Sequence, residues 1–109
     1  RGQFGYDHND DSMGIWTAAV NALSIDSSQN ATFAGHILPA ADNSKNLGSA
    51  SYRWANLYTG DLHLSNEGKE GNDIDGTTGN WTIQEGEDDL YLLNNKNGKK
   101  YKFALQEIK

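Results

Sequence analysis

The side chains that could perform chemistry are three histidines, fifteen carboxylates and eight serines, and the chain has no cysteine. His8, His36 and His63 lie far apart, without the i, i+4 spacing that places two imidazoles on one metal ion. Without cysteine there is no thiolate nucleophile, no thiolate metal site and no disulfide. No serine stands in a Gly-x-Ser-x-Gly turn. We therefore expect no catalytic residue, no metal and no cofactor, and predict that the chain is not an enzyme.

An acidic run from Asp7 to Asp11 superficially resembles a cation-binding loop. A helix-flanked calcium loop needs oxygen ligands at alternating positions, a glycine at the sixth position and a glutamate at the twelfth. Counted from Asp7, the sixth residue is Ser12 and the twelfth is Ala18. The run therefore predicts a solvated turn rather than a metal site.

The formal net charge of −6 limits the classes of partner. An acidic chain repels phosphate backbones, so nucleic acid is not an expected partner. No apolar run approaches the roughly 20 residues that span a bilayer, and no signal-peptide pattern opens the chain. We expect a soluble protein without membrane insertion.

Turn-forming residues are frequent in the chain, so turns must help to position any site. Twelve Gly, twelve Asn, ten Asp and eight Ser stand among 109 residues, with one Val and one Pro. Each of these four frequent residues favours tight turns for its own steric or hydrogen-bonding reason. Many short strands joined by such turns are typical of an all-β fold.

The clearest strands alternate apolar and polar residues. The segments 23–26 and 31–38 flank the polar turn 27–30 and predict a hairpin. The alternating segments 81–84 and 100–105, with the apolar segment 90–93 between them, predict a C-terminal three-stranded β-meander, whose second turn closes on Asn97-Gly98, a strong hairpin signal. Between these two regions, residues 66–80 are rich in Gly, Asn and acidic side chains and predict a loop or linker.

The segment 50–58 predicts a short helix. Trp54, Leu57 and Tyr58 have the i, i+3, i+4 spacing of one helical face, Ser49 is a candidate cap and Gly60 a stop. A helix of fewer than three turns is unstable alone, so packing must hold it.

Large apolar side chains are scarce, and a domain of this size buries only about 60–65% of its unfolded surface. A single copy would struggle to offset its chain entropy. Because disulfides are excluded, identical chains that share one core are the expected remedy. The alternative is a looser, partly disordered monomer.

The central sequence segment resembles one found in bacteriophage tail fibres and tailspikes, usually near the fibre's C-terminal end. The residues that carry this resemblance are Asp42, Asn43, Asn46, Leu47, Gly48, Ser49, Ser51, Arg53, Trp54, Asn56, Leu57, Tyr58, Gly60 and Asp61. The turn 26–30 is similar to an Asp-Ser-Ser-Gly-Asn turn of fibre shafts, with Gln29 in place of Gly; Asn30 tolerates positive φ, so we expect the turn to survive. Residues 79–109 look like C-terminal ends of structural proteins from marine tailed phages.

This resemblance implies an intertwined homotrimeric fibre end in the virion, attached to other tail proteins. It implies a shaft or neck at 1–65, a linker at 66–80 and a tip at 81–109, which binds a bacterial surface polysaccharide or outer-membrane protein. Many relatives follow the Arg-Trp segment with a self-cleaving chaperone domain; this chain carries residues 79–109 there instead.

Two sets of residues follow as candidates. The candidates for the trimer core are Leu47, Trp54, Leu57, Tyr58, Leu62 and Leu64, and the candidates for receptor contact, in the turns, are Glu87, Asp88, Asn95 and Lys96. Two alternatives stay open: the non-catalytic stalk of a polysaccharide-degrading tailspike, and a monomeric β-sandwich carbohydrate-binding module.

Overall fold

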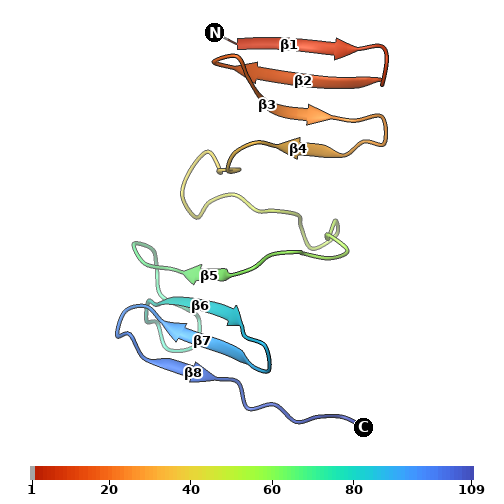
Figure 1. Ribbon diagram of the computed structural model, residues 1–109. Helices are drawn as coiled ribbons and strands as arrows, with labels where there is room; N and C mark the ends of the chain where they lie inside the picture. The colour runs from red at the N-terminus through yellow and green to blue at the C-terminus, as the bar shows by residue number, and fades with distance from the viewer. Residues whose placement is uncertain (1) are drawn as a thin grey trace. The chain divides into compact units, whose positions relative to one another are not determined.

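The computed structural model describes residues 2–109 and confirms the all-β prediction. The chain divides into two compact units, 1–45 and 46–109, and each contains one four-stranded antiparallel sheet. In both sheets every strand pairs with the next one along the chain, so each sheet is a simple meander (Figure 1). Within residues 2–109 no helix forms, and none is therefore long and apolar enough to cross a membrane.

The first unit holds a sheet in the order β1-β2-β3-β4. Its strands are β1 (Gly2–Asp7), β2 (Ser12–Thr17), β3 (Val20–Ile25) and β4 (Ala31–Phe33). The predicted hairpin of residues 23–38 is confirmed as β3 and β4, although β4 ends at Phe33 rather than at Leu38. The acidic run from Asp7 to Asp11 forms the β1–β2 turn, where Asp7 and Asp10 accept backbone hydrogen bonds from residues two positions later.

The β2–β3 connection is a two-residue turn with an unusual sequence. Thr17 pairs with Val20, and the turn residues Ala18 and Ala19 both have positive φ, at 49° and 63°. Two-residue hairpin turns of this type favour Asn-Gly, because a Cβ atom is strained at positive φ. Two alanines give no turn signal in the sequence, and the chain carries local strain here.

The β3–β4 turn survives its departure from the fibre-shaft pattern, by a route other than the one expected. Gln29, rather than Asn30, takes the positive φ, at 72°. The carboxylate of Asp26 organises the turn, because it accepts hydrogen bonds from the backbone N–H of Ser28 at 2.9 Å and of Asn30 at 3.0 Å, and from the Asn30 side-chain amide at 3.2 Å. The hydrogen bonds from Asn30, and then that from Ser28, lower the pKa of Asp26 below its usual value.

This turn should weaken in acid. A carboxyl whose pKa is lowered by folding contributes stability above its unfolded pKa, about 3.9, and loses that contribution as the pH falls through the folded value. We expect thermal melts between about pH 5 and pH 2 to show a larger loss of stability in the wild type than in Asp26→Asn, whose side chain does not titrate. Parallel pH profiles for the two proteins would contradict this role of Asp26.

The second unit holds a sheet in the order β5-β6-β7-β8. Its strands are β5 (Leu62–Ser65), β6 (Asn80–Glu85), β7 (Leu90–Asn94) and β8 (Lys100–Lys102). The predicted C-terminal meander is confirmed as β6 to β8, and β8 is shorter than expected. A fourth strand joins it, because β5 pairs with β6 across the intervening loop. The predicted linker at 66–80 therefore lies inside the second unit, which begins at Asn46.

The prediction of a short helix over 50–58 is wrong. Ser49 does cap a turn, since its Oγ accepts from the Tyr52 N–H at 3.1 Å, but the Ser49 N–H donates back to the Tyr52 carbonyl at 3.0 Å and closes a tight loop. Gly48 enters that loop with a φ of +82°. Trp54, Leu57 and Tyr58 are 68–90% exposed, so no packing holds a helical turn together.

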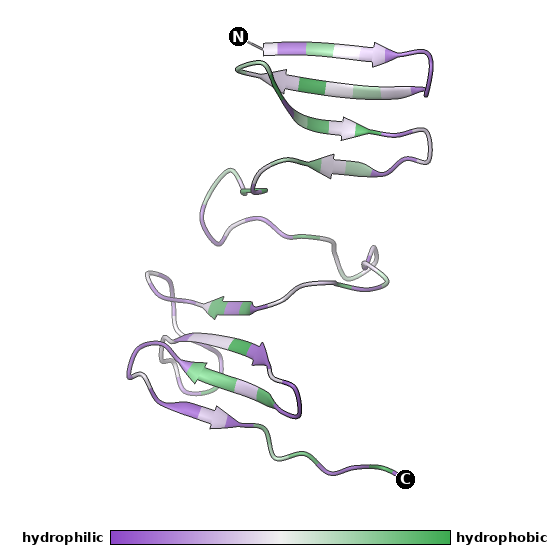
Figure 2. Ribbon diagram, viewed as in Figure 1, coloured by the Kyte–Doolittle hydropathy of each residue, from purple (hydrophilic) through white to green (hydrophobic). Residues whose placement is uncertain are grey.

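Neither sheet has an apolar core. Among residues 2–109 no hydrophobic side chain is buried, and Thr82, 3% exposed, is the one buried polar residue. Figure 2 shows the hydrophobic residues distributed along the strands, while most turns are hydrophilic. The fold therefore consists of single-layered sheets, each held together mainly by its backbone hydrogen bonds.

Candidate functional site

The second sheet carries most of its apolar residues on one face, while Tyr91 and Leu93 lie among polar partners on the other. Residues paired directly across an antiparallel sheet lie on the same face. The register pairs Leu62 with Ile83, Ile83 with Leu92, Leu92 with Tyr101, and Leu64 with Trp81. We call the resulting surface apolar face B; it consists of Leu62, Leu64, Trp81, Ile83, Leu90, Leu92, Tyr101 and Phe103.

The first sheet repeats this arrangement. The register aligns Phe4, Ile15, Leu23 and Phe33 in one row, and Tyr6, Met13 and Ile25 in the next. These seven residues form apolar face A. A hollow of about 190 Å³, lined almost wholly by apolar atoms, lies among Phe4, Met13, Ile15, Leu23 and Ile25. The hollow has the size and chemistry to receive an apolar side chain.

Within residues 2–109 no second sheet covers either face in its own unit, although the β5–β6 loop lies beside Leu64 and Trp81 at the edge of face B. On face A, Phe4 is 69% exposed and Phe33 47%; on face B, Leu64 is 48% exposed and Tyr101 46%. A sheet that is apolar on one face is stable only when that face packs against another element. The two apolar faces are therefore the candidate contact surfaces of the chain.

The predicted trimer-core residues divide into two groups. Leu62 and Leu64 lie on apolar face B. Leu47, Trp54, Leu57 and Tyr58 lie in the irregular segment that precedes β5, and all are highly exposed. The trimer-core candidates chosen from the sequence left out Trp81, Ile83, Leu92 and Tyr101, which share apolar face B with Leu62 and Leu64.

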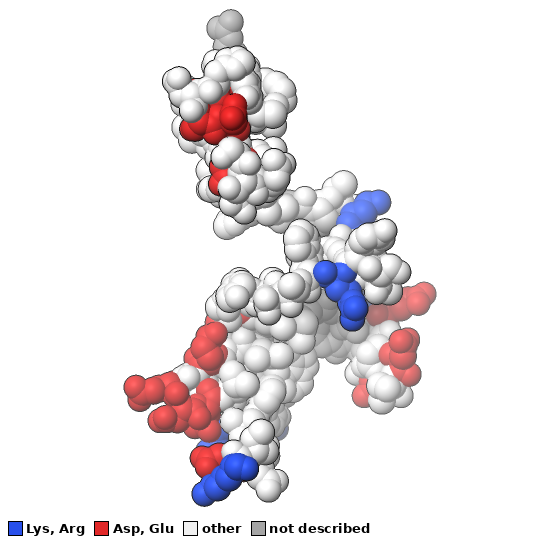
Figure 3. All heavy atoms as spheres, turned by 90° about the vertical axis from the view of Figure 1, so that its right-hand side faces the viewer, with Lys and Arg blue, Asp and Glu red and all other residues white. Residues whose placement is uncertain are grey.

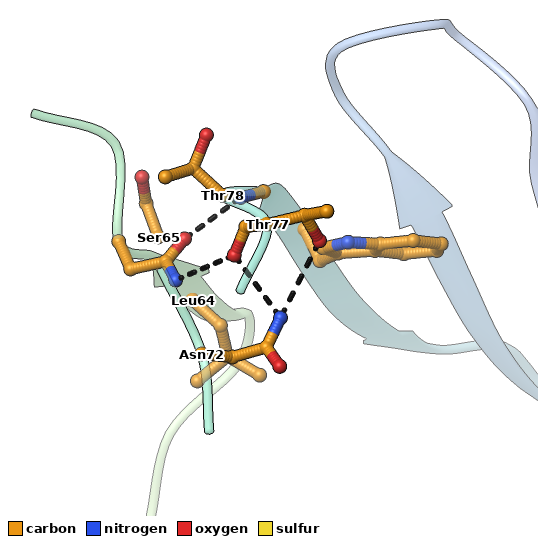
Figure 4. A pocket seen from close by; sticks show the side chains of 8 residues that line it. Leu64, Ser65, Asn72, Thr77 and Thr78 are labelled. Atoms are coloured by element: carbon orange, nitrogen blue, oxygen red, sulfur yellow. Dashed lines mark hydrogen bonds between the residues drawn. The ribbon is translucent and has the colours of Figure 1, made fainter. Parts of the chain in front are cut away.

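The loop between β5 and β6 is ordered by side-chain amides. Asn66 accepts from the Gly79 N–H at 2.7 Å, thirteen residues away, and closes the base of the loop. Asn72 organises its tip: its Oδ1 accepts from the N–H groups of Ile74 and Asp75, and its Nδ2 donates to the Thr77 carbonyl at 3.0 Å. Figure 4 shows the Asn72 amide directed at Thr77. The segment 66–80, predicted to be a loop or linker, is thus a loop whose shape is fixed by internal hydrogen bonds.

Two further features tighten this loop. The carboxylate of Asp75 accepts from the Thr77 hydroxyl at 2.8 Å and the Thr77 N–H at 3.1 Å, and these bonds, with one from Asn72, lower the pKa of Asp75. Gly71 lies so close to the backbone of Gly76 that a Cβ atom on Gly71 would stand 1.9 Å from the Gly76 carbonyl oxygen. The loop closes only because residue 71 has no side chain.

A hollow of about 380 Å³ opens beside this loop. Its lining residues are Leu64, Ser65, Asn66, Asn72, Thr77, Thr78, Gly79 and Trp81. The amides of Asn66 and Asn72 already bond within the loop. Leu64 and Trp81 belong to apolar face B. The hollow therefore lies between the hydrogen-bonded loop and apolar face B.

The opposite face of the second sheet carries a polar network. The buried hydroxyl of Thr82 accepts from the Asn95 Nδ2 at 2.9 Å and lies 3.0 Å from the Nδ1 atom of His63. The Asn95 amide also donates to the Asn80 side chain at 3.0 Å. This network ties β5 and β6 to the β7–β8 turn.

The predicted receptor-contact residues occupy the two ends of the second sheet (Figure 1). Glu87 and Asp88 lie in the β6–β7 turn, and Asn95 and Lys96 lie in the β7–β8 turn at the other end. Asn95 is held by the polar network, and Lys96 donates to the Thr78 carbonyl at 3.4 Å. The four residues do not form one site. Figure 3 shows acidic side chains gathered in clusters on the surface.

The described residues form few groups that could act as a catalytic or metal-binding site. Among residues 2–109 no group of three or more His, Asp or Glu side chains could hold a metal ion. Comparisons with protein-family models, curated proteins and solved structures give no match. The interpretation of function therefore rests on the two apolar faces and on the residues that surround them.

Proposed function

We propose that this chain is a structural and host-recognition part of a bacteriophage tail fibre, which assembles as a homotrimer. The observation that carries the proposal is that each sheet has one apolar face without cover in its own unit. Removing apolar surface from water contributes about 25 cal/mol per Å², and side chains such as Phe4 and Tyr101, which are exposed within their own units, would gain this on contact with another chain.

The topology of the sheets supports a fibre. Each strand pairs with its successor, so the chain advances about 4.8 Å per strand across the sheet. Three copies of such a sheet, with their apolar faces directed at a common axis, form a closed prism with a shared core. The threefold number comes from the resemblance of residues 42–61 to phage fibres.

Host recognition falls to exposed groups on the outside of this prism. The polar faces and the turns stay accessible when the apolar faces are covered, and loops held by a rigid scaffold commonly carry recognition. The β5–β6 loop is suited to this task, because its internal hydrogen bonds fix its shape before a ligand binds. Its target in this proposal is a bacterial surface polysaccharide or outer-membrane protein.

Sedimentation equilibrium of the purified protein tests the assembly. We expect a mass about three times the 12.0 kDa of one chain, together with a cooperative thermal transition. A compact 12.0 kDa species that melts cooperatively would refute the proposal, because it would show that one chain can cover its own apolar faces. A stable dimer would refute the threefold arrangement.

A further inference from the structure

Trp16 is the one large aromatic ring on the polar face of the first sheet near β1 and β2. The register pairs it with Gln3 and Asn21, opposite to apolar face A. An irregularity between Ile15 and Trp16 interrupts the β2–β3 register at this point. Such bulges commonly re-aim a side chain. Trp16 therefore does not contribute to apolar face A.

Two paired glycines leave the space that the Trp16 ring occupies. A Cβ atom on Gly14 would stand 2.6 Å from the ring, and one on Gly5 would stand 3.2 Å from it. Gly5 and Gly14 are direct partners across β1 and β2. The outer edge of the six-membered ring, its Cζ3 and Cη2 atoms, therefore lies beside the two glycines. The half-buried state of Trp16 agrees with this placement.

Two hollows are lined in part by Trp16. One, of about 350 Å³, is lined by residues that include Gln3, Asp7, Trp16, Asn21 and Ser24; the other, of about 440 Å³, is lined by Gly2, Gln3, Trp16 and Ala19. The side chains of Gln3 and Asn21 make no hydrogen bond to any residue in the described range 2–109, whereas Asn66, Asn72 and Asn95 are all engaged. The two amides are therefore available to a ligand.

The strained turn borders the second hollow. Ala18 and Ala19 hold positive φ without the Asn-Gly sequence that would relieve the strain. Strain of this kind clusters at functional sites. The small side chain of Ala19 leaves the hollow beside Trp16 open.

We propose that the polar face of the first sheet binds a neutral, pyranose-containing glycan, with Trp16 as the stacking platform and Gln3 and Asn21 as hydrogen-bonding partners. A pyranose presents C–H groups that suit the electron-rich face of an indole, and hydroxyls that both donate to and accept from amides. The net charge of −6 and the carboxylate of Asp7 disfavour an anionic sugar. The inference deepens the proposed host recognition and rests on it only for the outward position of the polar face.

A merely structural Trp16 would cover the two glycines and do nothing else. Labelling with 5-fluorotryptophan separates the two roles, because the chain has three tryptophans and each gives its own ¹⁹F signal. Trp→Phe variants assign the signals. The probes are the methyl glycosides of glucose, galactose, mannose and N-acetylglucosamine, each titrated to about 50 mM, above the millimolar Kd that so few contacts predict.

We expect at least one glycoside to move the Trp16 signal saturably and to leave Trp54 and Trp81 unchanged. Gln3→Ala should weaken this binding about tenfold, since one ligand hydrogen bond is lost. Gln84→Ala is the matched control, because Gln84 belongs to the other sheet and does not line either hollow at Trp16, so this substitution should not change the Kd.

Three outcomes would overturn the inference: a Trp16 signal that no glycoside moves, an equal effect of Gln3→Ala and Gln84→Ala, or a response at Trp54 or Trp81 instead. The mass of the same sample separates this inference from the proposed assembly. Glycoside binding at Trp16 by a monomeric chain would refute the trimer and support the glycan site. A trimer that binds no glycoside would support the assembly and refute the glycan site.

Discussion

Leu92→Asp is expected to abolish the assembly. Leu92 lies in the middle of apolar face B, where it pairs with Ile83 on one side and Tyr101 on the other. A carboxylate at this position would be taken out of water when the faces meet, at a cost of several kcal/mol without a partner of opposite charge. In sedimentation we expect the mass to fall from about three chains to one, either folded or unfolded.

Tyr91→Asp is the matched control for this variant. Tyr91 is the preceding residue on the same strand, but its partners are Gln84 and Lys102, so it lies on the polar face. Both variants replace a large side chain and add one negative charge. Tyr91→Asp should keep the wild-type mass. If Leu92→Asp also kept it, apolar face B would not be an interface.

The contrast between these two neighbours shows what the sequence could predict. Alternation in residues 81–84 and 100–105, together with Asn97-Gly98, identified the C-terminal meander, whereas the run from Leu90 to Leu93 does not alternate and its two faces are shown by the strand register. The same logic does not identify β2, because Ile15 and Trp16 are adjacent apolar residues on opposite faces and the Ala18–Ala19 turn has no hairpin signal. Such a turn is visible only in the backbone angles, which local propensity does not reveal.

The helix expected over 50–58 failed for a different physical reason. The spacing of Trp54, Leu57 and Tyr58 fits one helical face, but a face stabilises a short helix only if something packs against it. The tight loop of Ser49 to Tyr52 satisfies the local hydrogen bonds in another way. Periodicity within nine residues was too weak a signal to decide between the two.

The β5–β6 loop was the hardest part to foresee. Its composition predicted a loop, and gave no sign that amide side chains would fix its shape. The bond from Gly79 to Asn66 spans thirteen residues, and the network at the tip depends on the single rotamer in which Asn72 serves three partners. Propensities describe neighbours in sequence, whereas these contacts depend on the closed loop as a whole.

Gly71→Ala should therefore open this loop and cost about 3 kcal/mol or more, at the upper end of overpacking effects. The added Cβ atom would stand 1.9 Å from the Gly76 carbonyl oxygen, and a backbone atom cannot move aside as a flexible side chain can. Gly60→Ala is the control, because a Cβ atom there meets nothing within 4 Å and φ is not positive. Thermal melting should show a large loss for Gly71→Ala and almost none for Gly60→Ala. Hydrogen exchange at the Thr77 and Gly79 amides should accelerate in the first variant alone, and equal exchange in both would show that close packing of Gly71 does not hold the loop shut.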